Sequence, residues 1–193
     1  MRSFTIAMML LLFTTLSFAT ETTMSNLHPR VKLQTSLGDI IIELDGEKAP
    51  ISTKNFLQYV NEGFYTGTIF HRIIKGFMAQ GGGFTTDFEQ KPVHASIKNE
   101  ADNGLKNDRG TLAMARTPDP DSATAQFFIN YKDNDFLNYS ASTPQGWGYA
   151  VFAKVVEGME VIDDMAKQAI GNHGMHQDVP KTDIIITNAE ILD

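Results

Sequence analysis

The 193-residue sequence contains no cysteine, and its basic residues are fewer than its acidic ones. Without cysteine, disulfides, thiol nucleophiles, zinc-thiolate sites and iron-sulfur clusters are all excluded. Lysine and arginine total 16 against 23 aspartate and glutamate, which gives a formal net charge of -7. No basic run supplies the positive surface that nucleic-acid binding requires, so a nucleic-acid partner is not expected. A hydrophobic content of 42% argues against disorder, and the length favours one domain.

Long apolar runs are also scarce, and the one near the N-terminus has the features of a secretory signal peptide. The run over residues 6–13 follows a positive charge, and Ser17 and Ala19 place small residues where signal peptidase cleaves. This run is shorter than the roughly 20 apolar residues that cross a bilayer, although an uncleaved anchor is the alternative. We therefore expect a periplasmic or secreted protein, free of the membrane after cleavage. The predicted parts are a signal peptide over 1–19, a polar tail over 20–30 and one domain over 31–193.

Strand and helix patterns in the remaining chain favour a mainly β fold. Period-two alternation on both sides of a Ser-Leu-Gly-Asp turn predicts a β-hairpin over 31–44. Apolar residues at helical spacing predict one helix between Ala49 and Gly63 and a second over 159–169. Many short strands with two separate helices favour a closed or nearly closed antiparallel barrel with helices over its ends. The further strands are predicted at 68–74, 77–80, 111–115, 127–130, 151–156 and 183–192.

Three of these strand segments carry an apolar and a flat polar residue two positions apart, and such residues share one face of a strand. A face of this kind suits a shallow pocket that takes an apolar ring and also holds a peptide backbone. The alternative is that the polar residues face solvent on the outside of the barrel. The pairs are Phe70 with Arg72, Met78 with Gln80, and Gln126 with Phe128.

An ordered set of motifs along the chain resembles that of the cyclophilins, a family of peptidyl-prolyl cis/trans isomerases. The motifs are 70–82 (FHRIIKGFMAQGG), 112–115 (LAMA), 122–130 (SATAQFFIN), 148–155 (GYAVFAKV) and 157–159 (EGM). The resemblance implies a closed eight-stranded antiparallel barrel capped by two α-helices. It also implies an enzyme without cofactor or metal that accelerates X-Pro isomerisation during the folding of exported proteins. A proline-segment binding module or holdase with incidental turnover is the alternative function.

The resemblance also implies roles for individual residues. Arg72 matches the catalytic arginine of the family. The residues that match its proline pocket are Phe77, Met78, Phe128 and Leu137. The residues that match its contacts to the substrate backbone are Gln80, Arg116 and Gln126. Ala115 and Thr117 match residues that line its groove.

Four positions depart from the best-known eukaryotic members of the family. Arg116 and Thr117 replace Asn and Ala, Phe136 replaces a Trp, and Tyr149 replaces a His. With these four residues, the sequence resembles the Gram-negative bacterial, periplasmic branch of the family. The resemblance implies weak cyclosporin binding, because Phe136 lacks the indole N–H that the Trp supplies. Phe136 and Tyr149 are also expected to contact substrate. The implied partners are proline-containing polypeptides, and we expect a monomer.

Other candidate sites have simpler interpretations. His71 lies next to Arg72 but on the opposite strand face, which predicts a structural histidine and not a general base. His173 and His176 are three residues apart, yet nearby glycines disfavour a helix, and Asp178 is the one obvious carboxylate for a metal site. A secreted hydrolase is disfavoured because the chain has no G-x-S-x-G motif.

Overall fold

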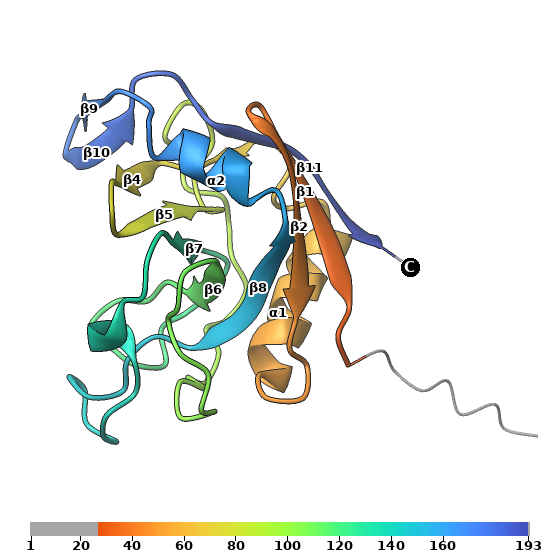
Figure 1. Ribbon diagram of the computed structural model, residues 1–193, viewed down its shortest axis with the longest axis vertical. Helices are drawn as coiled ribbons and strands as arrows, with labels where there is room; N and C mark the ends of the chain where they lie inside the picture. The colour runs from red at the N-terminus through yellow and green to blue at the C-terminus, as the bar shows by residue number, and fades with distance from the viewer. Residues whose placement is uncertain (1–26, 193) are drawn as a thin grey trace, which may run out of the picture.

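One curled antiparallel sheet of nine strands makes up most of the computed structural model, which describes residues 27–192 (Figure 1). The predicted signal peptide and residues 20–26 of the predicted tail lie outside the described residues. Within 27–192, no helix is both long and apolar enough to cross a membrane. The sheet order is β3-β11-β1-β2-β8-β6-β7-β5-β4. Its strands are β1 (Arg30–Thr35), β2 (Gly38–Leu44), β3 (Thr68–Ile69), β4 (Arg72–Ile74), β5 (Met78–Gly81), β6 (Thr111–Met114), β7 (Phe127–Asn130), β8 (Val151–Glu157) and β11 (Ile185–Leu192).

The two edge strands of this sheet, β3 and β4, are adjoining parts of one stretch of chain. They are interrupted at Phe70 and His71, so the sheet curls back toward its own beginning. The predicted mainly β architecture is confirmed, and eight strands result when β3 and β4 are counted as one. The predicted closed eight-stranded barrel is therefore an approximation of this curled half-barrel. The interruption also breaks the alternation of side chains between the two faces of the strand. Phe70 enters the main core whereas Arg72 is partly exposed, so the two do not share a face as predicted.

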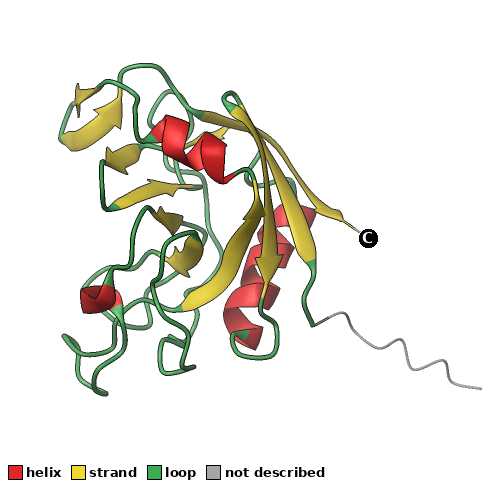
Figure 2. Cartoon of the chain, viewed as in Figure 1, coloured by secondary structure: helices red, strands yellow, loops and turns green. Residues whose placement is uncertain are grey.

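In the described part of the chain, two α-helices accompany the sheet, as predicted. Helix α1 (Pro50–Asn61) contacts β8 and β11, and α2 (Met159–Met165) contacts β2. In Figure 2, α2 lies near the upper end of the long strands and α1 beside their lower half. Helix α1 begins at a proline, which suits the first helical position because its missing N–H has no partner to lose there.

Helix α2 ends four residues earlier than predicted, and the chain then forms a hairpin that the sequence analysis did not predict. Its strands are β9 (Ile170–His173) and β10 (His176–Pro180), which make a separate two-stranded sheet. Most of its side chains are exposed or half-buried, so it lacks the apolar alternation by which strands are recognised. Gly174 has a φ of 56° in the turn, a left-handed conformation that glycine adopts without strain.

The main core lies inside the curl and is rich in aromatic rings. The Phe56 ring of α1 lies with its centroid 5.0 Å from that of Tyr65, 5.6 Å from that of Phe127 and 5.3 Å from that of Phe152. A smaller apolar cluster is formed by Met78, Ala113, Phe128, Leu137 and Val151. Because neighbouring residues such as Ala79, Leu112 and Ile129 belong to the main core, strand alternation places this second cluster on the opposite face of the sheet.

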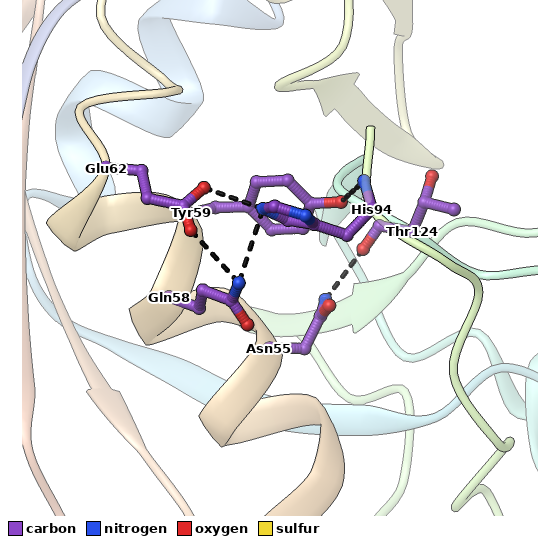
Figure 3. Close-up of polar contacts among 6 residues, drawn as sticks. All are labelled: Asn55, Gln58, Tyr59, Glu62, His94 and Thr124. Atoms are coloured by element: carbon purple, nitrogen blue, oxygen red, sulfur yellow. Dashed lines mark hydrogen bonds and ion pairs between the residues drawn. The ribbon is translucent and has the colours of Figure 1, made fainter. Parts of the chain in front are cut away.

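The long segment 82–110 between β5 and β6 is held against helix α1 by side-chain contacts (Figure 3). The backbone N–H of His94 donates to the Tyr59 hydroxyl at 2.9 Å, and its ring Nε2 lies 2.7 Å from a Glu62 carboxylate oxygen. Gln58 joins the same group, since its Nε2 lies 3.0 Å from Glu62 and 3.3 Å from the His94 ring. A segment with little regular structure thus has a fixed path across the helix.

Candidate active site

A hollow of about 170 Å³ lies over the smaller apolar cluster, on the sheet face that points away from the main core. All of its lining residues belong to the set that the sequence analysis named. They are Arg72, Phe77, Met78, Gln80, Ala115, Arg116, Phe128, Leu137 and Tyr149. The other three members of that set, Thr117, Gln126 and Phe136, each contact this group or adjoin it in the chain, as described below.

The floor of the hollow is apolar because three neighbouring strands present small or apolar side chains on this face. Met78 on β5 and Phe128 on β7 are buried, and Leu137 from the short 3-10 helix η1 (Asp135–Leu137) closes the floor. The Tyr149 ring meets Phe128 edge to face, with centroids 5.5 Å apart. This arrangement provides an apolar surface of the kind that an apolar ring can rest on.

One wall of the hollow is polar and comes from residues that strand pairing brings together. Arg72 on β4 lies directly opposite Gln80 on β5, and Gln80 Nε2 donates to Gln126 Oε1 at 3.0 Å. Gly83 makes room for this pair, because a Cβ at that position would overlap the Gln126 side chain. The Arg72 side chain is 44% exposed, so its charge is accessible to a ligand in the hollow.

The opposite wall is stiffened by Arg116, whose guanidinium lies 4.7 Å above the centre of the Tyr149 ring. Its Nε donates to the Gly148 carbonyl at 2.8 Å, and one terminal nitrogen donates to the Thr117 carbonyl at 2.9 Å. Thr117 is tied down in turn, since its backbone N–H and its hydroxyl both donate to Ser122 Oγ. Arg116 therefore uses its Nε and one terminal nitrogen within the chain. The substrate-backbone contact that the resemblance implies would have to come from its other N–H groups.

An exposed aromatic ring forms the rim. Phe136 is 72% exposed, and its ring stacks on that of Phe77 with centroids 5.5 Å apart. Beneath this rim lie buried asparagines that the sequence analysis did not single out. Asn134 donates to the Phe77 carbonyl at 3.0 Å and Asn107 donates to the Leu137 carbonyl at 3.2 Å. Both asparagines therefore fix the backbone that carries the pocket residues.

The unpredicted hairpin brings a carboxylate to the polar wall. Asp178 Oδ2 lies 3.8 Å from Arg72 Nε. The sequence analysis considered Asp178 only as a metal ligand beside His173 and His176, but those rings contact phenylalanines. His173 stacks on Phe88 at 4.0 Å, and no group of three or more metal-binding residues occurs within 27–192.

His71 is buried behind Arg72, which agrees with the prediction of a structural histidine, although it lies in the interruption between β3 and β4. Its ring meets Phe84 with centroids 4.8 Å apart, and its Nδ1 has no hydrogen-bond partner among residues 27–192. Burial lowers the pKa of His71 to about 4, and the nearby charges of His176 and Arg72 lower it further in the same direction. The ring is therefore neutral near pH 7 and forms part of the support of β4.

A larger hollow, of about 300 Å³, lies elsewhere on the molecule, between β2, β6 and β8. Its floor includes Leu44 and Val151, and its rim is charged. The Glu43 carboxylate on that rim is already paired with Arg30 at 3.1 Å and Lys154 at 3.2 Å. None of its lining residues is one to which the resemblance assigns a role, and the hollow at Arg72 is the stronger candidate.

Comparison with known proteins gives a consistent result. The family described as "Cyclophilin type peptidyl-prolyl cis-trans isomerase/CLD" matches residues 30–191. Peptidyl-prolyl cis-trans isomerase B of Escherichia coli K12 is 60% identical over 161 residues, which are 83% of this chain and 98% of that protein. Peptidyl-prolyl cis-trans isomerase cyp18 of Streptomyces antibioticus is 57% identical over 162 residues, covering 84% and 98% of the two chains.

A solved structure agrees with the fold. The cyclophilin type peptidyl-prolyl cis-trans isomerase of Cryptosporidium parvum, crystallised in the presence of the dipeptide Ala-Pro, superposes with a TM-score of 0.68 at 30% sequence identity. The similarity covers 85% of this chain and 99% of that one.

Proposed function

Because this chain belongs to the cyclophilin-type peptidyl-prolyl cis-trans isomerases and is an enzyme that isomerises X-Pro bonds, we propose that the hollow at Arg72 is where the bond rotates. The observation that carries the proposal is a charged, accessible guanidinium beside a buried apolar floor that fits a proline ring. Substrates are proline-containing polypeptides, and the ring would rest on Met78, Phe128 and Leu137, with Phe77 at its side.

The proposed chemistry follows from the resistance of the amide bond. Resonance gives the C–N bond a rotational barrier of about 18 to 20 kcal/mol, and no bond has to break for isomerisation. In the twisted state the proline nitrogen is pyramidal and carries a lone pair that can accept a hydrogen bond. A donor aimed at this nitrogen stabilises the twisted amide more than the planar one, which is the condition for catalysis. Arg72 supplies that donor through its guanidinium N–H groups.

Arg72 is not sufficient alone. Accelerating the exchange about ten-thousandfold requires about 5.5 kcal/mol, whereas one charge-assisted hydrogen bond contributes about 1.5 to 3 kcal/mol. We assign the remainder to the apolar floor, which removes the amide from water and immobilises the ring. The paired amides of Gln80 and Gln126 are placed to hold the substrate backbone, while Arg116 and Tyr149 keep the facing wall in position.

The rest of the groove is proposed to receive the residues on either side of the proline. Ala115 lines the hollow, Thr117 would extend that side two residues further along the chain, and the exposed Phe136 ring offers an apolar contact at the rim. Weak cyclosporin binding is expected, because a phenyl ring at position 136 has no N–H to donate. We further propose that the protein acts on exported chains in the periplasm, since residues 1–19 have signal-peptide features. It is proposed to act there as a monomer.

The proposal is tested by the cis-to-trans rate of a short Ala-Pro-Phe peptide, measured with wild type and the Arg72→Ala variant. We expect the variant to lose about 10- to 100-fold in kcat/KM, the value of one charge-assisted hydrogen bond. Arg30→Ala is the matched control, because Arg30 is an exposed arginine paired with Glu43 on β1 and β2. An Arg72→Ala protein with an undiminished rate would remove the chemistry from this hollow. Background rates from the folded wild type would favour the proline-binding alternative.

A further inference from the structure

A carboxylate lies beside the polar wall of the hollow, next to the Nε of the Arg72 guanidinium. Asp178 Oδ2 lies 3.8 Å from the Nε of Arg72, with side chains that are 35% and 44% exposed. Nε is the inner nitrogen of the guanidinium, so a contact there leaves the two terminal nitrogens available. The pair therefore joins the proposed catalytic group to a strand outside the main sheet.

The backbone at Asp178 is irregular in a way that directs its side chain. Its φ is 59°, and it is one of only two non-glycine residues with a positive φ within 27–192. The pairing of β9 with β10 also shifts register between His176 and Val179. An extra residue in a strand leaves the ladder and re-aims its side chain, and such bulges often lie next to active sites.

The hairpin that carries Asp178 is itself fixed against the main sheet. Figure 1 shows β9 and β10 beside β4, and β10 contacts β4 directly. His173 stacks flat on Phe88, and the His176 ring lies 5.3 Å from those of both Phe84 and Phe88. A carboxylate on this hairpin is thus held at a defined place next to Arg72, unlike a charge on a free loop.

We propose that Asp178 is a positioning residue for Arg72. Its carboxylate holds the Nε edge of the guanidinium, and the terminal nitrogens are thereby directed into the hollow. This inference rests on the proposed role of Arg72. The competing explanation is that an aspartate occurs here because Asp and Asn tolerate a left-handed backbone better than other side chains.

The Asp178→Asn variant separates these explanations, because asparagine keeps the tolerance for positive φ and removes only the charge. We expect kcat and kcat/KM to fall together by about fivefold, the value of a favourable exposed ion pair, with KM unchanged. Asp39→Asn is the matched control. It removes the same charge from the Lys32 pair on β1 and β2, two strands that contribute no residue to the hollow.

A double-mutant cycle with Arg72→Lys shows whether Asp178 acts through the guanidinium, because lysine has no Nε–H at the corresponding place. In that background Asp178→Asn should change kcat less than twofold. A spectroscopic readout independent of activity is the Nε–H resonance of Arg72, identified by its loss in Arg72→Lys. It should move in Asp178→Asn and stay in place in Asp39→Asn.

The outcomes distinguish the two proposals. An inactive Arg72→Ala protein together with a fully active Asp178→Asn protein and an unmoved Arg72 resonance would overturn the positioning role alone. An Arg72→Ala protein of wild-type rate would overturn the proposed function and this inference with it. Equal losses from Asp178→Asn in the wild-type and Arg72→Lys backgrounds would also reject the positioning role, since the effect would not pass through the guanidinium.

Discussion

His71 and Arg72, the residue before β4 and its first residue, have opposite chemical environments. The His71 ring is buried against Phe84, whereas the Arg72 side chain is half exposed in the hollow. Burial penalises the charged form of His71 and lowers its pKa to about 4, so that the ring does not add a second positive charge beside Arg72 near pH 7. The start of β4 thus separates a buried structural group from a candidate catalytic group one position away.

The burial of His71 predicts a pH dependence of stability. In the unfolded chain the ring binds a proton near pH 6.5, but in the folded protein it does so only near pH 4. Between these values the unfolded state holds more protons, so the free energy of unfolding falls as the pH is lowered from 6.5 toward 4. The loss from this residue reaches about 3 kcal/mol.

The His71→Phe variant tests this dependence, because phenylalanine does not titrate and preserves a ring against Phe84. Urea unfolding at several pH values between 7 and 4 should give a shallower loss of stability in the variant than in wild type. Identical slopes would mean that other groups are responsible. Stability at pH 7 provides the control for packing, since both rings are neutral there.

The positions of most site residues could be predicted from the sequence because the motifs lie on regular strands. Met78 and Gln80 share a face of β5 as alternation requires, and both line the hollow. Asp178 could not be identified as a partner of Arg72, because that contact joins distant parts of the chain through a hairpin with no apolar pattern. The prediction that Phe70 shares a face with Arg72 was wrong, because the strand is interrupted between them.

At the scale of elements, helix α1 lacks a local cap and receives one from the long segment 82–110. Its N-cap residue, Ala49, makes no side-chain cap bond. The Glu100 carboxylate instead accepts hydrogen bonds from the backbone N–H of Ile51 at 2.9 Å and of Ser52 at 2.7 Å, and a third from the Ser52 hydroxyl. A negative charge at this end also interacts favourably with the helix dipole.

This distant cap predicts a large effect from a small change. Glu100→Gln keeps the shape of the side chain but places an amide donor against the helix N–H groups. We expect the free energy of unfolding to fall by about 1 to 2 kcal/mol, the value of a lost cap with a buried donor left unpaired. Glu89→Gln, at an exposed glutamate outside the helix, is the control and should leave the denaturant midpoint unchanged. A Glu100→Gln midpoint equal to that of wild type would contradict the capping role.

The elements also differ in how well the sequence predicts them. The hairpin β1–β2 and helix α1 have strong period-two and helical patterns with clear turn and stop signals, and both lie close to their predicted bounds. Helix α2 is shorter than predicted because the apolar spacing gives way to the exposed strand β9. Patterns of burial cannot identify elements that are themselves little buried.

At the scale of the whole molecule, the hollow exists only because the sheet curls. Its residues come from β4, β5, β7 and the loops up to Tyr149, which the order β6-β7-β5-β4 places side by side. The family match over residues 30–191 includes every residue that lines the hollow. Folding and catalysis should therefore be independent of residues 1–19.

The proposed export can be tested on the full chain in a Gram-negative host. We expect the wild-type protein in the periplasmic fraction with Thr20 as its first residue, because Ser17 and Ala19 provide the small side chains that signal peptidase requires. Ala19→Phe should accumulate as an uncleaved precursor, whereas Phe18→Tyr, at the unrestricted position between them, should be processed normally. Mass spectrometry of each fraction measures the cleavage. Full-length wild-type protein in the membrane fraction would show an uncleaved anchor, and full-length protein in the cytoplasm would reject export altogether.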